Sequence, residues 1–416
     1  MQAPDVPLTP DASHTKHDRR LASLDGLRGI AALSVFTFHG WLYTMPKPVA
    51  TDRSSFGDYA AHELRLGLVL FFVLSGFLLS RSWFAAALDG RGLPDVRCYA
   101  RTRVARIAPA YYVALLGSIV LLWRLSGTPG LRLPPGYEIP LFVVFAQNFS
   151  PASVMKLNPP TWSLAVEVMF YALLPLIGWL AVRMPRRRRC QALIPLALLV
   201  LGVAYNWVIA GLDLGMTFSK TLAAMLPYFA VGMLAALALH GRTIRTATRR
   251  TSIAGGLALV LADATLKAAA PAHGVDATAV FSVIRDLPSA LGFALVVGAL
   301  AVAPRGRVIG GPVLVGMGTI SYGFYLWHVP VLMVLRGHGL LPLDPALGTL
   351  VALVPALAVS VLSWFAIERP IIAWAGRRNQ RAREEQRLTP VRARSGSGGV
   401  DRRAAGGGRE VSTVRA

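Results

Sequence analysis

The chain has 416 residues, of which 54% are hydrophobic and 15% charged, and its formal net charge is +22. Apolar runs of about twenty residues recur throughout, which is typical of a protein that crosses a membrane many times and argues against a soluble domain. The arginines cluster in short stretches between these runs and in the C-terminal tail. This distribution sets orientation in a membrane, so the positive charge does not indicate nucleic-acid binding.

The first apolar run, residues 24–43, contains Arg28 and His39. Ionisable residues are costly inside a bilayer and mark functional sites by default. On a helix, the eleven positions between them correspond to within about 20° of a whole number of turns, and to about 16 Å along the axis. The two side chains therefore share one face at a spacing that suits an extended ligand.

The hydrophobic pattern predicts an all-α, polytopic membrane bundle of ten helices. The expected spans are 24–43, 65–83, 107–124, 161–182, 191–210, 219–240, 252–270, 282–303, 312–335 and 346–368. An eleventh apolar segment, 139–149, is too short to cross at about 1.5 Å per residue. If this segment is re-entrant or interfacial, every basic loop falls on one side, so we expect both termini in the cytosol.

Three regions follow from this pattern. Residues 1–22 are expected to form a polar cytosolic tail without a cleavable signal, and residues 23–372 a single transmembrane domain. Residues 373–416 lack apolar periodicity and are expected to be a disordered basic cytosolic tail.

Glu167 lies six residues into the span 161–182, which places it at a depth similar to that of His39. A functional interpretation is that Glu167 orients the His39 imidazole and stabilises its protonated form. The alternatives are a carboxylate that pairs with a buried arginine, and a His39 that lies in the interfacial belt. Ser163, one turn before Glu167, is a candidate partner of the carboxylate or the substrate, or else a helix N-cap.

Ser321, Tyr325 and His328 lie along one face of the span 312–335. Such a polar stripe should face the bundle interior, either as a set of substrate contacts or as a hydrogen-bonded packing surface. His328 is also an alternative base. Arg103 and Arg106 share a helix face before the third span, where they are candidates for binding phosphate or simply follow the positive-inside bias.

Two further patterns are read as structural. Ser75 and Gly76, in FFVLSGFLLS, favour close helix packing over contact with a ligand. The histidines and cysteines lack the spacing of metal ligands, so no metal is expected.

Six segments together resemble, in this order, the acyltransferase type 3 family of integral membrane acyltransferases. They are RLASLDGLRGIAALSVFTFHG, FFVLSGFLLS, RTRVARIAPAYY, PPTWSLAVEVMFY, GTISYGFYLWHVPV and IERP, and the resemblance covers about residues 20–372. The family's Arg–ten residues–His signature corresponds to Arg28 and His39, and its Ser–three residues–Glu signature to Ser163 and Glu167. Its paired-arginine loop corresponds to residues 103 and 106.

The resemblance implies an acyltransferase in the bacterial plasma membrane that uses acyl-CoA, expected to be acetyl-CoA, as donor and binds no permanent cofactor. The acceptor would be a hydroxyl of a carbohydrate, a cell-envelope glycan or a glycosylated natural product. Arg28, Arg103 and Arg106 would bind the donor phosphates, and His39 would act as general base with Glu167 beside it. The oxyanion donor stays open among a backbone N–H, Tyr325 and His328.

The main alternative is a transporter or flippase of a lipid-linked or small-molecule substrate, proton-coupled through His39 and Glu167. The sequence shows no inverted repeat and few paired Gly/Pro interruptions, which argues against it. The identity of the acceptor cannot be read from the loops.

Overall fold

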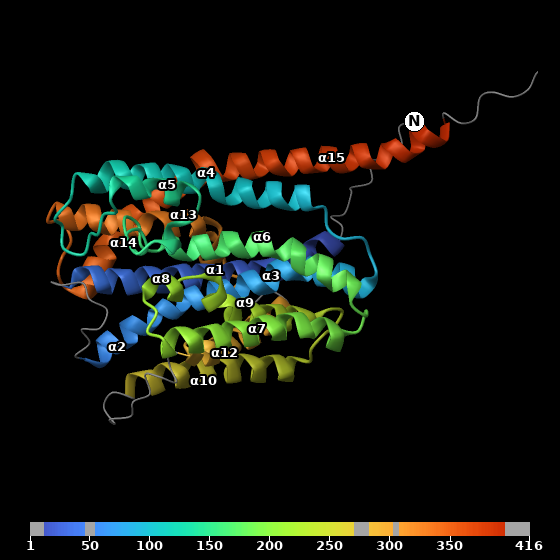
Figure 1. The fold of residues 1–416 in the computed structure, drawn as a ribbon, viewed down its shortest axis with the longest axis horizontal. Coiled ribbons are helices and arrows are strands. Elements are labelled where there is room, and N and C mark those ends of the chain that lie inside the picture. Colours follow the sequence, from blue (N-terminus) through green and yellow to red (C-terminus); the bar gives the residue numbers. More distant parts are fainter. Residues whose placement is uncertain (1–11, 46–54, 270–282, 303–307, 396–416) are drawn as a thin grey trace, which may run out of the picture.

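The computed structural model describes residues 12–45, 55–269, 283–302 and 308–395. Every regular element in these ranges is a helix, and the long helices lie roughly side by side in one bundle (Figure 1). The all-α class predicted from the hydrophobic pattern is therefore confirmed for the described part of the chain.

The long helices are α1 (Ala12–Thr44), α3 (Gly67–Asp89), α4 (Val96–Trp123), α6 (Thr161–Arg183), α7 (Arg188–Gly211), α9 (Leu222–Leu239), α10 (Thr246–Ala269), α12 (Leu287–Ala301), α13 (Pro312–Gly337), α14 (Pro345–Ser363) and α15 (Arg369–Ser395). The short ones are α2 (Phe56–Glu63), α5 (Ile139–Val143), α8 (Met216–Ser219) and the 3-10 turns η1 (Leu64–Leu66), η2 (Gly136–Glu138) and η3 (Gln147–Phe149). A single π-helical turn, η5 (Trp364–Glu368), joins α14 to α15 without a break.

Seven helical segments within the described residues are long and apolar enough to cross a membrane. They are Phe56–Asp89, Val96–Trp123, Thr161–Arg183, Arg188–Gly211, Met216–Leu239, Pro312–Gly337 and Pro345–Ala382. The expected spans 24–43, 252–270 and 282–303 fall on α1, α10 and α12, of which α12 is apolar but has only 15 residues. The count of ten crossings and the cytosolic location of both termini stay predictions.

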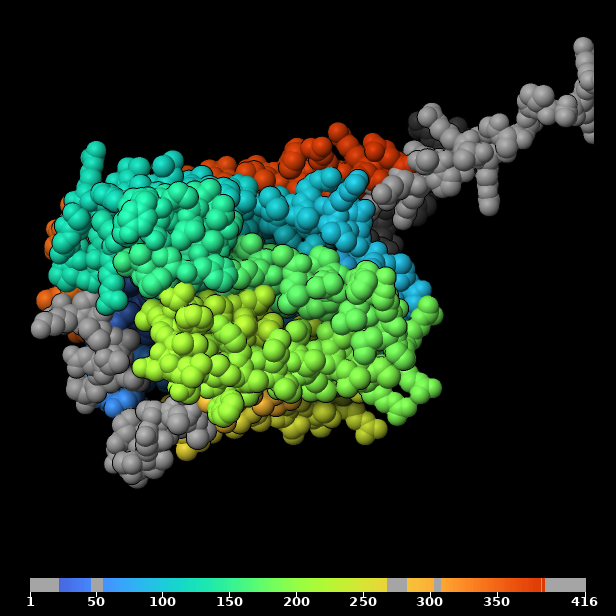
Figure 2. All heavy atoms as spheres, viewed as in Figure 1, coloured from blue at the N-terminus to red at the C-terminus, as the bar shows by residue number. Residues whose placement is uncertain are grey.

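The segment 139–149 does not form a continuous helix, as expected from its length. It is divided into α5 and η3, and it folds back onto its neighbours. The Tyr111 hydroxyl of α4 donates to the Phe142 carbonyl oxygen at 2.7 Å, and Asn148 Nδ2 donates to the carbonyl oxygens of Trp162 and Lys220. In Figure 2 this teal region and the yellow-green region around α8 lie next to each other and cover one end of the bundle.

The expectation of a disordered tail from residue 373 is wrong up to residue 395, because α15 continues as a helix through Ser395. It lies along α4 at one edge of the bundle (Figure 1). Asn379 fixes this packing: its Oδ1 accepts from Arg101, and its Nδ2 donates to the Thr102 hydroxyl at 2.9 Å. In the sequence alone, the basic residues of α15 resemble a polar tail. The contacts that order them as a helix come from α4, about 280 positions earlier in the chain. Residues 396–416 and 1–11 lie outside the described residues.

Helices α1 and α13 approach until their backbones touch at glycines. A Cβ at Gly318 would lie 1.9 Å from the Asp25 carbonyl oxygen, and one at Gly29 would lie 2.5 Å from that of Leu314. Any larger residue would force the helices apart. Small residues at such crossings are a common device in membranes, where dispersion contacts rather than water exclusion hold helices together.

The α3–α9 crossing is built in the same way. A Cβ at Gly76 would lie 2.2 Å from the Phe229 carbonyl oxygen, and one at Gly232 would lie 2.2 Å from that of Val73. The packing interpretation of Gly76 is therefore confirmed. The neighbouring Ser75 has a second role, described below.

We predict that Gly318→Ala destabilises the protein by about 1–3 kcal/mol, because the added methyl group overpacks the α1–α13 contact. Gly316 is the matched control: it lies two residues earlier on α13 and has nothing within 4 Å of its Cβ position. Gly316→Ala should be neutral or slightly stabilising, since alanine favours helix by up to about 1 kcal/mol over glycine. Unfolding of the purified protein in mixed detergent and dodecyl sulfate, followed by circular dichroism, measures both. Equal effects would contradict the backbone contact.

Candidate active site

Two adjoining cavities lie inside the bundle. The first, here the arginine cavity, has a volume of about 60 Å³ and includes Arg28, Arg106, Glu167 and Tyr325 among its lining residues. The second, the histidine cavity, has a volume of about 290 Å³ and includes His39. Leu68, Phe72 and Tyr325 line both cavities. Six of the eight predicted site residues thus line these two adjoining cavities, and Arg103 and His328 do not.

His39 of α1 and His328 of α13 form a hydrogen-bonded pair. His39 Nδ1 lies 2.9 Å from the Val35 carbonyl oxygen and 3.1 Å from His328 Nε2, while His328 Nδ1 lies 3.1 Å from the Phe324 carbonyl oxygen. His328 is 1% exposed. The polar stripe on α13 therefore faces the interior, and its last residue contacts the candidate base directly.

The backbone contacts assign the tautomers of both rings. A carbonyl oxygen only accepts, so each Nδ1 must carry the proton. The His39 Nδ1–H is then shared between Val35 and the lone pair of His328 Nε2. This leaves His39 Nε2 unprotonated, with no hydrogen-bond partner among the described residues. An unprotonated imidazole nitrogen at a cavity wall is the form that a general base requires.

Glu167 does not contact His39, contrary to the expectation that it orients this ring. Its Oε1 accepts a hydrogen bond from the Ser75 hydroxyl at 2.5 Å, and the side chain lines the arginine cavity. His328 occupies the place beside His39 that the sequence assigned to Glu167. Ser75, which the sequence favoured as a packing residue, is thus the direct partner of this half-buried carboxylate.

The depth of Glu167 differs from the expected one because α6 begins inside the bundle. Trp162, at its start, already lines the histidine cavity, and Glu167 lies about 7.5 Å further along the helix axis. Asn158, just before α6, donates from Nδ2 to the Leu326 carbonyl oxygen of α13 at 2.9 Å. This contact places the start of α6 level with the His328 turn, so Glu167 falls level with the arginine cavity instead.

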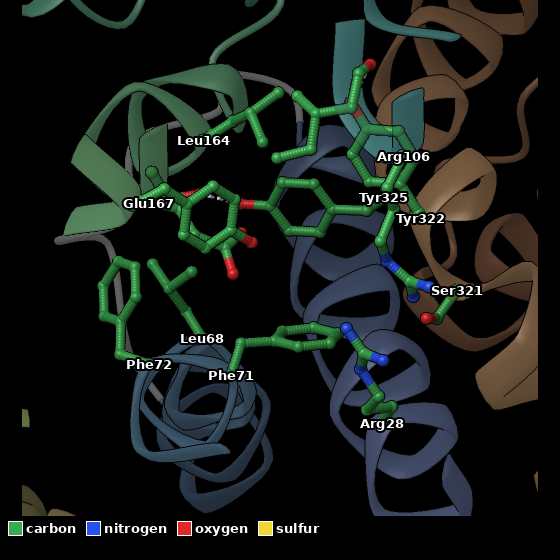
Figure 3. Close-up of a pocket in the computed structure, with 13 residues that line it drawn as sticks. Arg28, Leu68, Phe71, Phe72, Arg106, Leu164, Glu167, Ser321, Tyr322 and Tyr325 are labelled. Carbon is green, nitrogen blue, oxygen red and sulfur yellow. Dashed lines mark hydrogen bonds between the residues drawn. The ribbon is translucent and has the colours of Figure 1, made fainter. Parts of the chain in front are cut away.

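Arg28 of α1 and Arg106 of α4 point into the same part of the arginine cavity, beside Ser321 (Figure 3). Neither forms an ion pair with a carboxylate in the described part of the chain. Two half-buried guanidinium groups that make no ion pair favour an anionic ligand. Arg103 lies apart from this cavity: its guanidinium is 5.9 Å from the Tyr99 ring centroid and 5.8 Å from that of Tyr171. Of the three predicted donor-binding arginines, Arg28 and Arg106 therefore line the cavity and Arg103 does not.

Ser163 and Tyr325 form a hydroxyl pair between the two cavities. Their oxygens lie 2.6 Å apart, and each is 3.0 Å from the Pro160 carbonyl oxygen. Ser163 therefore neither caps α6, which begins at Thr161, nor bonds Glu167. The pair holds Tyr325 at the boundary: the residue lines the arginine cavity (Figure 3) and also the histidine cavity.

Several cavity residues were missed by the sequence analysis. Tyr171 lines the arginine cavity, and Arg65, Lys220, Arg285 and Asp286 line the histidine cavity. The available signal was that the four charged residues lie at the ends of the predicted spans 65–83, 219–240 and 282–303, inside the apolar segments. No cluster of metal-ligating side chains occurs among the described residues.

The comparisons with known proteins agree with this arrangement. A family model described as an acyltransferase domain, that of acyltransferase type 3, matches residues 21–366. The chain is 32% identical to acyltransferase MdmB of Streptomyces mycarofaciens over 341 residues, which cover 77% of this chain and 81% of that protein. It is 27% identical to the exopolysaccharide production protein ExoZ of Rhizobium meliloti over 318 residues, covering 74% and 89%.

A third relative is the putative peptidoglycan O-acetyltransferase YrhL of Bacillus subtilis, 29% identical over 202 residues, which cover 44% of this chain and 28% of that protein. No solved structure is significantly similar to the chain. The family match spans most of the transmembrane region and includes both cavities. The chain therefore belongs to the acyltransferase type 3 family of multi-helix membrane acyltransferases.

Proposed function

We propose that this acyltransferase moves an acetyl or other short acyl group from acyl-CoA to a hydroxyl of a carbohydrate, cell-envelope glycan or glycosylated natural product. The observation that carries the proposal is the histidine pair in a cavity that adjoins, across Tyr325, a second cavity with two unpaired arginines. The first arrangement suits a base that activates a hydroxyl, and the second suits an anionic donor. The printed names of two relatives, which refer to peptidoglycan and exopolysaccharide, favour a glycan acceptor.

In the proposed geometry the donor occupies the arginine cavity and the acceptor the histidine cavity. Arg28 and Arg106 bind phosphate groups of the coenzyme, with Arg103 behind them, and the thioester extends past Tyr325. A single donor molecule would then extend along α1 from Arg28 to His39, eleven residues further along the helix. The donor arrives from the cytosolic side if the predicted orientation holds.

The transfer itself needs one base and one oxyanion donor. His39 Nε2 takes the proton of the acceptor hydroxyl as its oxygen attacks the thioester carbonyl carbon. The tetrahedral intermediate collapses, the carbon–sulfur bond breaks, and the leaving thiolate takes the proton from His39. His328, which accepts the Nδ1 proton of His39, keeps the imidazole in the reactive tautomer. Tyr325 is the oxyanion donor we favour, because its hydroxyl lies at the boundary of the two cavities. Its O–H turns from the Pro160 carbonyl oxygen to the oxyanion, and Ser163 continues to donate to Pro160.

The experiment that tests the function is incubation of the purified protein with radiolabelled acetyl-CoA. Acyl transfer to an added glycan or slow hydrolysis supports the enzyme. Movement of a substrate across proteoliposomes without thioester cleavage would instead support the transporter. Envelope glycans and secreted glycosides from cells with and without the gene, compared by mass spectrometry, would identify the acceptor.

We predict that His39→Gln lowers the rate of acyl transfer by about 10²–10⁴-fold, the usual contribution of a general base. His338 of the same bundle provides the control, because its Nδ1 bonds the Val334 carbonyl oxygen with the same i−4 geometry, and it is exposed outside both cavities. His338→Gln should retain full activity. A fully active His39→Gln protein would remove His39 from the mechanism.

The pH dependence of the transfer rate distinguishes His328 from Glu167 as the partner of His39. His328→Gln should shift the acidic limb of the pH–rate profile, because His328 contacts the titrating ring at 3.1 Å. Glu167→Gln should lower the rate without moving this limb, because its carboxylate bonds Ser75 instead. The profile of kcat/KM over pH 5–9 for both variants measures this. A shift confined to Glu167→Gln would restore the role that the sequence suggested.

Replacing Arg28 and Arg106 together by Gln should raise the KM for acetyl-CoA at least about tenfold, since a charge-assisted hydrogen bond contributes about 1.5–3 kcal/mol. Arg183→Gln is the control, because that guanidinium lies over the Trp179 ring at 3.6 Å, away from both cavities. The KM values are obtained from initial rates of coenzyme A release. An unchanged KM in the double variant would argue against the donor assignment.

A further inference from the structure

The histidine cavity has a charged wall that the proposed chemistry does not use. Four cations and three carboxylates meet on and behind this wall, from α2, η1, the turn between α8 and α9, α10 and the residues just before α12. Arg65, Lys220, Arg285 and Asp286 line the cavity, and Glu63, Asp263 and Lys267 extend the charged cluster behind them. The positive charges exceed the negative ones by one.

Asp286 is fully occupied by two of these cations. Its Oδ2 accepts from Arg65 Nη1 at 2.7 Å, and its Oδ1 accepts from Arg65 Nη2 at 2.9 Å and from Lys267 Nζ at 2.8 Å. Lys267 also bonds Asp263 at 2.9 Å, and Arg65 also bonds Glu63 at 3.2 Å. Arg65 and Lys267 between them engage all three carboxylates, and Glu63 also bonds His62 Nδ1 at 2.9 Å.

Lys220 and Arg285 remain outside this network although both line the cavity. The Lys220 ammonium lies 4.3 Å from the Trp162 ring centroid and makes no hydrogen bond or ion pair within the described residues. Arg285 makes two weak contacts to neutral oxygens, 3.2 Å to the Ser219 carbonyl and 3.4 Å to Asn206 Oδ1. A guanidinium has five N–H donors, so most of its capacity is unused.

We propose that this wall binds an oxyanion, a carboxylate or a phosphate, carried by the acceptor. Half-buried cations without a counter-charge are costly, and a bound anion would both neutralise the excess charge and satisfy the free donors. Arg285 suits a planar or tetrahedral oxyanion through two parallel hydrogen bonds, and Lys220 adds a point charge above an aromatic ring. Trp162, beneath Lys220, supplies an apolar surface of the kind on which a sugar ring can lie.

This inference rests on the proposed function, because it assigns the histidine cavity to the acceptor. His39 lies in the same cavity, so an acceptor held by its anionic group at Lys220 and Arg285 would present a hydroxyl to His39 Nε2. The enzyme would then select acidic acceptors, such as uronic acids or sugar phosphates, over neutral ones of the same size. The two arginines in the other cavity remain for the donor.

The experiment is a binding measurement that needs no turnover. The purified full chain in neutral detergent is titrated calorimetrically with glucuronate, glucose 6-phosphate and glucose, which differ in charge on a shared ring. Wild type should bind both anions at least about tenfold more tightly than glucose. Lys220→Met and Arg285→Gln should each reduce this preference about tenfold, whereas Lys220→Arg, which keeps the charge, should retain it.

Arg183→Gln is again the control, because it also removes a cation that lies over a tryptophan ring, but outside the cavity. It should leave the preference unchanged. Equal binding of charged and neutral sugars by wild type, or a preference that survives both Lys220→Met and Arg285→Gln, would overturn the proposal.

A competition experiment identifies the source of the oxyanion. If phosphatidylglycerol added to the micelles competes with glucuronate in wild type, but not in Lys220→Met, the oxyanion belongs to a lipid headgroup. Without such competition, the oxyanion belongs to a soluble acceptor.

The proposed function and the oxyanion site can fail separately. Anion binding that depends on Lys220, in a protein that neither transfers nor hydrolyses radiolabelled acetyl-CoA, would contradict the acyltransfer chemistry and keep the site. Acetyl transfer with equal kcat/KM for glucuronate and glucose would keep the chemistry and remove the site.

Discussion

The site depends on the close approach of α1 and α13. At Gly29 and Gly318 the two helices touch backbone to backbone, and further along the same pair of helices His39 and His328 come within hydrogen-bond distance. A side chain at either glycine would separate the helices and with them the two imidazoles. Small residues in a membrane bundle therefore have a direct consequence for chemistry, because they set the distance between polar groups on the facing helices.

The second constraint is that each polar side chain in the bundle interior needs a partner or a ligand. Ser75 serves this purpose for Glu167, and His328 for His39. Arg28 and Arg106 have no carboxylate partner among the described residues, although they lie in a cavity with Glu167. Glu167 and His39 are therefore held in place by other side chains, whereas the two guanidinium groups are available to bind a substrate.

The two cavities divide the proposed reaction between a donor side and an acceptor side. Tyr325 belongs to both, and the hydroxyl pair that it forms with Ser163 is anchored to the Pro160 carbonyl. A single tyrosine on a rigid helix thus lies where the two substrates would meet. The charged wall around Lys220 and Arg285 adds a basis for acceptor choice that is independent of the base.

The sequence by itself determined the helical class and the family, and it predicted the approximate positions of the long helices between residues 24 and 368. It also made Arg28, His39 and Glu167 candidates for the site, because they lie inside apolar spans. Apolar periodicity and the cost of buried charge are local properties, so they can be read along the chain. The sequence could not determine which side chains contact one another. Only the tertiary structure decided that His328 rather than Glu167 contacts His39, because the depth of α6 is set by the Asn158 contact to α13. The order in α15 and the ion-pair network of Asp286 likewise arise from contacts between segments far apart in sequence, which no local pattern encodes.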